Sequence, residues 1–173
     1  MRVGKRMCAI FILCIMLIPT GCAKSPPDPV GYLGGNFMAE LCGTNGKTEF
    51  CATVTVENCD GGRLCTVRYI TPEILCDVEI TLLYTTDGKP RGGAEIKASD
   101  GFFYTASAVA VEGLCAPLRC LVSAPEISAV QKLDSGYLFT HPDGSSLLLS
   151  SDGAPVKYDS PSVAFDVVWF QRG

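Results

Sequence analysis

The sequence predicts a mainly β fold, built as a single curved antiparallel sheet of about 10 to 11 strands with one short helical lid segment. Three observations predict it. Apolar and polar residues alternate within short segments, turn-forming residues separate these segments at short and even spacing, and no βαβ rhythm occurs. Because so many strands in one layer must curl, we expect an unclosed half-barrel.

Residues 1–21 are typical of an export signal. Arg2, Lys5 and Arg6 precede an apolar run over residues 7–18, which is shorter than the about 20 residues that span a bilayer. Cys22 follows Gly21, and this junction resembles the lipobox of bacterial lipoproteins. The resemblance implies a lipid on Cys22 and a protein anchored at the extracytoplasmic face of the cell membrane. A plain secretory signal and a retained anchor helix are the alternatives, since Pro19 stands where the family prefers leucine.

The rest of the chain divides into a tether and one domain. Residues 22–35 contain three prolines and three glycines with little to bury, which predicts a flexible tether. Residues 36–173, about 138 in number, have the length of one domain, so we expect a single antiparallel β domain there. The whole chain has 14 basic and 18 acidic residues; without the three basic residues of the leader the net charge is about −7. No basic stripe is present, so nucleic acid is not an expected partner. We expect a monomer.

The segment from Phe50 to Leu82 determines the faces of the central sheet. Folding about Asn45-Gly46 and about Gly61-Gly62 brings apolar positions together on one face and polar positions on the other. The predicted cross-strand pairs are Phe37–Val54, Ala39–Ala52, Leu41–Phe50, Val54–Tyr69 and Val56–Val67. The residues predicted to line the concave face are Phe50, Val54, Val56, Val67, Tyr69, Val78, Ile80 and Leu82.

Later elements follow from the same alternation. Pro72 ends the third strand, because proline cannot donate to a strand ladder. The remaining strands are expected at residues 76–84, 94–98, 102–104, 105–111, 127–133, 137–140, 145–150, 155–158 and 163–170. Residues 114–123 form the only expected helix, with Pro117 in its first turn, and we expect it to lie across the sheet.

Seven cysteines lie beyond the leader and the lipidation site: Cys42, Cys51, Cys59, Cys65, Cys76, Cys115 and Cys120. An odd number excludes a closed set of disulfides within one chain. With no Cys-x-x-Cys and a single histidine, we expect no metal or other cofactor.

The register assigns some of these cysteines to faces. Cys65 falls on the apolar face and Cys51 on the polar face, so these two cannot pair. Cys42 and Cys51 share the polar face at diagonal positions, where a disulfide is an alternative. The favoured interpretation is that the cysteines are free thiols, serving as small apolar residues in the envelope of an anaerobe.

We expect no catalytic activity. A nucleophilic triad would need His141, the only histidine, but His141 precedes the turn residues Pro142-Asp143-Gly144 and is expected to be solvated. The Asp-Gly pairs are turn formers without the spacing of paired catalytic carboxylates. Trp169 and Phe170 end the last strand, and we interpret them as core anchors, with a ligand-groove wall as the alternative.

The order of these elements resembles the LolA/LolB-like lipoprotein-carrier superfamily, in the small form found in Gram-positive anaerobes. The similarity covers residues 36–173 and rests on a first hairpin, the segments at 67–75, 147–155 and 165–170, an Asp-Gly hairpin and a short helical insertion. It implies a half-barrel whose concave apolar face receives acyl chains. Two hypotheses follow: a lipoprotein that binds a lipid or acyl chain, or a structural lipoprotein whose hollow is filled by its own core.

Overall fold

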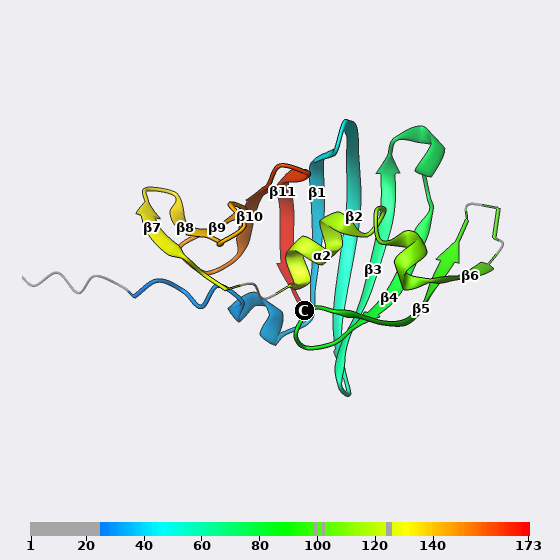
Figure 1. The fold of residues 1–173 in the computed structure, drawn as a ribbon, viewed down its shortest axis with the longest axis horizontal. Helices are drawn as coiled ribbons and strands as arrows, with labels where there is room; N and C mark the ends of the chain where they lie inside the picture. Colours follow the sequence, from blue (N-terminus) through cyan, green and yellow to red (C-terminus); the bar gives the residue numbers. More distant parts are fainter. Residues whose placement is uncertain (1–24, 99, 102, 124–125) are drawn as a thin grey trace, which may run out of the picture.

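A computed structural model of the chain describes residues 25–98, 100–101, 103–123 and 126–173 (Figure 1). Within these residues, 11 strands form one antiparallel sheet in the order β6-β5-β4-β3-β2-β1-β11-β10-β9-β8-β7. The sheet does not close, so β6 and β7 are its two edges. The predicted fold class is therefore confirmed. The predicted leader and Cys22 lie outside the described residues.

The elements have the following bounds. The strands are β1 (Phe37–Asn45), β2 (Thr48–Cys59), β3 (Gly62–Thr71), β4 (Glu79–Tyr84), β5 (Pro90–Lys97), β6 (Phe103–Ser107), β7 (Ala129–Leu133), β8 (Gly136–Thr140), β9 (Ser146–Leu149), β10 (Pro155–Asp159) and β11 (Val163–Arg172). The helical segments are η1 (Gly31–Gly34), η2 (Glu73–Leu75), η3 (Ala108–Val111) and α2 (Ala116–Val122).

Three predicted strands differ from the structure. The strands expected at 102–104 and 105–111 are not separate, because β6 runs without a break from Phe103 to Ser107. The strand expected at 105–111 is wrong in its second half, because β6 ends at Ser107 and residues 108–111 form the 3-10 helix η3. The strand expected from residue 76 begins at Glu79, because Asp77 adopts a φ of 61°, which is outside the strand region.

The central register is displaced by two residues from the prediction. Val56 pairs with Cys65 and Val54 with Val67, and on the other side Leu41 pairs with Ala52. The β2–β3 turn is formed by Asp60 and Gly61 instead of Gly61 and Gly62, since Cys59 pairs with Gly62. A displacement by two keeps every side chain on its predicted face, because side chains alternate with a period of two. The predicted faces are correct and the predicted partners are wrong.

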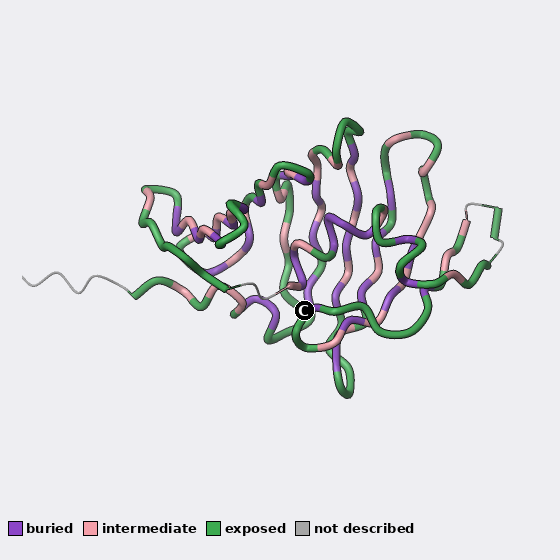
Figure 2. Tube along the Cα trace, in the orientation of Figure 1, coloured by how far each residue is buried: buried purple, intermediate pink, exposed green. Residues whose placement is uncertain are grey.

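Helix α2 lies across the concave face of the sheet, as expected, and passes in front of β1 and β2 in Figure 1. Its side chains Leu118, Leu121 and Val122 are fully buried. Figure 2 shows that the buried residues follow the middle strands and the helix. The core thus lies between the sheet and a thin second layer that includes α2, which has Pro117 in its first turn.

The segment just before β1 is part of this core. Tyr32 and Leu33 of η1 are only 2% and 3% exposed, and the Tyr32 hydroxyl donates a hydrogen bond of 2.7 Å to the Leu121 carbonyl oxygen. Residues 22–35 were expected to bury little, and this part of the prediction is wrong. The folded part of the chain begins near Asp28, whose carbonyl oxygen accepts a hydrogen bond from the Gly31 amide.

Asp-Gly turns recur between the outer strands. In the β4–β5 and β8–β9 turns the glycine amide donates to the carbonyl oxygen three residues earlier, and Gly88 and Gly144 have φ values of 78° and 83°. Glycine suits these positions because L side chains are strained there. The two turns differ in their surroundings: a Cβ on Gly88 would lie 2.7 Å from the Ser123 Cα atom, whereas a Cβ on Gly144 would meet nothing within 4 Å.

This difference gives a matched pair of variants. We expect Gly144→Ala to lower the free energy of unfolding by about 1 kcal/mol, the cost of a left-handed alanine. Gly88→Ala adds a backbone clash at the end of α2, so we expect a loss of about 2–4 kcal/mol. Urea denaturation followed by circular dichroism measures both. Equal losses would show that the β4–β5 turn does not support α2.

Candidate functional site

An apolar hollow of about 490 Å³ lies at one end of the concave face. Its lining comes from the β1–β2 turn, the η2 turn and the turn that precedes α2, and Figure 1 shows the first two of these turns at the upper end of the sheet. No lining residue is charged. The lining comprises Asn45, Thr48, Phe50, Tyr69, Pro72, Ile74, Leu75, Ala110, Gly113 and Leu114. This volume falls within the range of about 300–1,000 Å³ that is typical of small-molecule sites.

The hollow exists because β3 is too short to pair with the first residues of β2. The β2–β3 pairing stops at Cys51 and Thr71, and the next residue, Pro72, begins the η2 turn. Residues 48–50 of β2 therefore have a strand neighbour on the β1 side only. The Thr71 hydroxyl accepts a hydrogen bond from the Cys51 amide and finishes the ladder. Beyond this point, side chains from η2 and from the turn before α2 form the walls.

Two side chains hold the turn before α2 against the sheet. The Asn45 side-chain amide donates a 2.7 Å hydrogen bond to the Gly113 carbonyl oxygen. The Tyr69 hydroxyl donates to the Leu114 carbonyl oxygen, and its ring packs edge-on against Phe50. Burial raises the pKa of Tyr69, so the hydroxyl stays protonated and remains a donor. These bonds satisfy the Asn45 amide and the Tyr69 hydroxyl, and most of the surface that lines the hollow is apolar.

The structure separates the eight predicted concave-face residues into two groups. Phe50 and Tyr69 line the hollow. The other six lie in or against the hydrophobic core, with Val78 partly buried and the rest at most 2% exposed: Val54, Val56, Val67, Val78, Ile80 and Leu82. The middle of the concave face is thus filled by the protein's own side chains, and the hollow lies at its end.

Sequence reasoning missed several wall residues. Ile74 and Leu75 were assigned to a turn, and Ile74 is 87% exposed at the rim of the hollow. Adjacent large apolar residues in a turn were the available signal, because a turn has no core of its own in which to bury them. Asn45 was interpreted as a turn former only, although its side chain reaches Gly113.

Cys42 and Cys51 form a disulfide. The free-thiol interpretation is therefore wrong for this pair, and the alternative is correct. The two-residue displacement is the reason, since it places Cys42 directly opposite Cys51 instead of diagonal to it. Cys65 and Cys115 are buried free thiols, as the apolar interpretation expects, and burial raises the pKa of each to about 12. Cys59 and Cys76 are exposed free thiols, so the apolar interpretation is wrong for them.

The structure also tests the predictions for His141, Trp169 and Phe170. His141 is 4% exposed and its Nδ1 lies 2.9 Å from the Glu126 carbonyl oxygen, so the expectation of a solvated histidine is wrong. Trp169 is 43% exposed on the convex face, so it is not a core anchor, whereas Phe170 packs against Tyr32 and Phe37. Among the described residues, no group of three or more potential metal-ligating side chains occurs.

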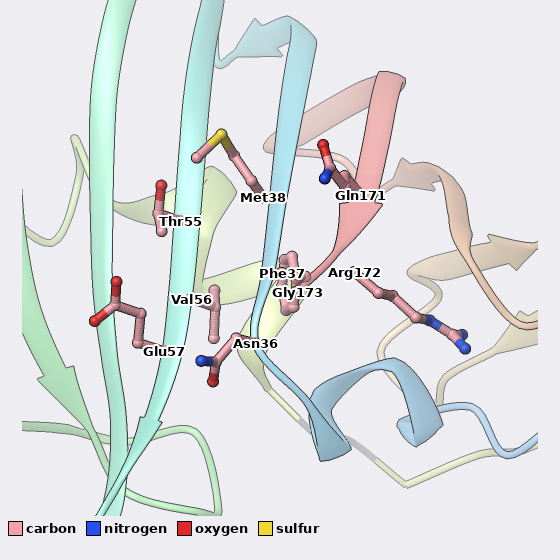
Figure 3. A pocket seen from close by; sticks show the side chains of 9 residues that line it. All are labelled: Asn36, Phe37, Met38, Thr55, Val56, Glu57, Gln171, Arg172 and Gly173. Carbon is pink, nitrogen blue, oxygen red and sulfur yellow. The ribbon is translucent and has the colours of Figure 1, made fainter.

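A second pocket lies at the opposite end of β1, near the C-terminus (Figure 3). Its volume is about 210 Å³, and its lining includes the charged residues Glu57 and Arg172 together with Met38 and Gln171. Less than half the volume and two charges make it a weaker site for an apolar ligand than the hollow.

Within the part of the chain that the structure covers, no helix has the length and hydropathy needed to cross a bilayer. No family model matches the chain, and no curated protein matches it in sequence.

Several solved structures match most of the chain. An uncharacterised conserved protein from Thermus thermophilus has a TM-score of 0.48 and 15% identity, over 82% of this chain and 81% of that chain. A putative outer membrane lipoprotein-sorting protein domain from Vibrio parahaemolyticus has a TM-score of 0.41 and 8% identity, over 82% and 86%. A LolA superfamily protein from Nitrosomonas europaea has a TM-score of 0.35 and 8% identity, over 80% and 86%. The superfamily that the sequence resembles is represented among these structures, but likeness at this level carries no conclusion about function.

Proposed function

We propose that this protein is a non-catalytic lipoprotein of the cell envelope that binds a lipid or acyl chain. In this proposal a lipid on Cys22 anchors it at the extracytoplasmic face of the cell membrane, and the hollow receives the apolar part of the ligand. The observation that carries the proposal is the uncharged hollow of about 490 Å³ beside the turn before α2. Two of its polar side chains, Asn45 and Tyr69, already donate to backbone carbonyls, and most of its lining surface is apolar, which suits hydrocarbon.

The alternative is a structural or interaction lipoprotein that binds no ligand. One observation favours it: the middle of the concave face is filled, with Val54, Val67 and Leu118 fully buried. The two functions differ in whether the open end of the concave face takes up a chain.

Native mass spectrometry of residues 25–173, purified without detergent, tests the proposal. This range retains Tyr32 and Leu33, which belong to the core. Copurified lipid, identified after extraction, would support a binding protein and name its ligand class. A protein that is empty and also fails to take up a fluorescent fatty acid would favour the structural alternative.

A single change at the rim sharpens this test. We expect Ile74→Asp to weaken fatty-acid binding by about tenfold, which corresponds to about 1.4 kcal/mol, because it places a carboxylate beside hydrocarbon. Ile74 is 87% exposed, so we expect the substitution to change the free energy of unfolding little. Val168→Asp is the matched control, since Val168 is 61% exposed and does not line the hollow. Fluorescence titration measures both, and equal binding by both variants would place the ligand elsewhere.

A further inference from the structure

The Cys42–Cys51 disulfide lies at the base of one wall of the hollow. We define the hairpin tip as residues 43–50, the part of β1 and β2 beyond this cross-link. Cys42 and Cys51 face each other directly, on the side of the sheet away from the core. Three further residue pairs, from Gly43–Phe50 to Asn45–Thr48, complete the tip. Beyond this disulfide, only the turn itself joins β1 to β2 covalently.

The two halves of the hairpin tip are held unequally. The β1 half pairs with β11 as far as Asn45 and Val163, and the Gly46 amide donates to the Ser162 carbonyl oxygen. The β2 half, residues 48–50, has β1 as its only strand neighbour, because β3 has already left at Pro72. Besides β1, the disulfide and the packing of the Phe50 ring against Tyr69 and Phe165 keep it in place.

The weakly held half contributes two of the three hairpin-tip residues that line the hollow, the third being Asn45 of the β1 half. Thr48 and Phe50 line the hollow, and they are the β2 residues that movement of the tip would displace. The opposite wall, at Gly113, is tied to Asn45 and thus to the β1 half. Loosening residues 48–50 would therefore widen the hollow while leaving its other walls in position.

The disulfide is accessible from solvent. Both cysteines are partly exposed, and a surface depression of about 350 Å³ lies over them, lined by residues that include Thr44, Glu49 and Thr71. A reducing thiol can therefore approach the sulfurs without unfolding the sheet. The buried thiols Cys65 and Cys115 have raised pKa values and are not thiolates at neutral pH. The exposed free thiols Cys59 and Cys76 do not line this depression.

We propose that reduction of Cys42–Cys51 is a redox switch that opens the hollow. A dithiol reductant attacks one sulfur through its thiolate, forming a mixed disulfide, and its second thiol then displaces the protein sulfur. Two electrons and two protons pass to the protein, which leaves two cysteine thiols and an oxidised reductant. Without the cross-link, residues 48–50 separate more readily from β1 and the hollow accepts a chain more readily. This inference rests on the proposed function.

Photolabelling of the full-length lipidated protein in lipid nanodiscs tests the switch. The probe is palmitate carrying a diazirine, and the labelled peptides are mapped by mass spectrometry in the oxidised protein and after treatment with dithiothreitol. We expect labelling of the peptides that contain Phe50 and Ile74 to rise by about fivefold on reduction, at the low end of coupling between sites. Reoxidation should reverse the rise. Hydrogen exchange at residues 48–50 should increase in parallel.

A variant supplies the control. Cys42→Ser/Cys51→Ser should label at the reduced level and should not respond to dithiothreitol, which separates this disulfide from other effects of the reductant. Should the variant fail to fold, reversible reduction of the wild-type protein still decides the question. Equal labelling of the oxidised and reduced protein overturns the switch and leaves the proposed function standing. Absence of labelling in both states overturns the ligand site and the switch together.

Discussion

The variant Gly43→Ala is expected to unfold the protein or to break the β1–β11 ladder. A Cβ at this position would lie 2.0 Å from the Ala164 carbonyl oxygen and 2.5 Å from the Phe165 Cα atom. Both are backbone atoms, so no change of rotamer relieves the overlap, and strands in the middle of an 11-stranded sheet have little freedom to move apart. We expect a loss of more than about 4 kcal/mol, a large share of the stability of an ordinary domain.

Urea denaturation of Gly43→Ala measures this loss, with Gly35→Ala as the matched control. Gly35 has extended backbone angles, and a Cβ there would meet nothing within 4 Å. We expect Gly35→Ala to unfold at the wild-type midpoint. If both variants did so, the close approach of β1 to β11 would not exist in solution.

The second large effect concerns the segment before the sheet. Tyr32→Ala is expected to cost about 3–5 kcal/mol, because it empties a fully enclosed aromatic site. The Tyr32 ring packs edge-on against Phe37 and Phe170, and its hydroxyl donates to the Leu121 carbonyl oxygen. Tyr32→Phe keeps the ring and leaves that carbonyl without its partner, so we expect a loss of about 1–3 kcal/mol.

Tyr104→Ala provides the comparison for Tyr32. Tyr104 lies on the edge strand β6 and is 53% exposed, so its removal should change stability by no more than about 0.5 kcal/mol. A chain that begins at Asn36 should be destabilised at least as much as Tyr32→Ala. Thermal unfolding of the three variants and the shortened chain measures these effects; a stable shortened chain would mean that η1 is a dispensable part of the tether.

The sequence was sufficient for the faces of the sheet and insufficient for its pairing. Alternation assigns Val54 and Val67 to the core side whichever residues they oppose, and both are fully buried. Since a displacement by two residues preserves every face, the pairing depends on which residues form the turn, and Asp60, Gly61 and Gly62 offer more than one two-residue turn. The missed disulfide has a similar origin in the β1–β2 turn, which is formed by Gly46 and Lys47 instead of the predicted Asn45 and Gly46, because Cys42 and Cys51 meet only in the true register.

The candidate site was partly predictable for a related reason. Phe50 and Tyr69 follow from alternation, whereas Ile74 and Leu114 come from turns whose position depends on contacts far away in the sequence. Tyr69 reaches Leu114 across 45 residues, and Asn45 reaches Gly113 across 68. His141 shows the same limit: its neighbours predict a solvated turn, but the segment at Glu126 covers it.

The folded part of the chain begins close to Cys22, and this short distance affects how the hollow would meet a ligand. Only five residues lie between Cys22 and Asp28, near which the folded part begins, and the six Cα-to-Cα steps of this stretch span about 20 Å when fully extended. With the proposed lipid on Cys22, the domain could not move farther than this from the bilayer surface. Its hollow would then meet the lipids of its own membrane at an effective concentration on the order of millimolar, as for binding partners joined by a short linker. A weak intrinsic affinity would suffice at such a concentration, and rapid release would come with it.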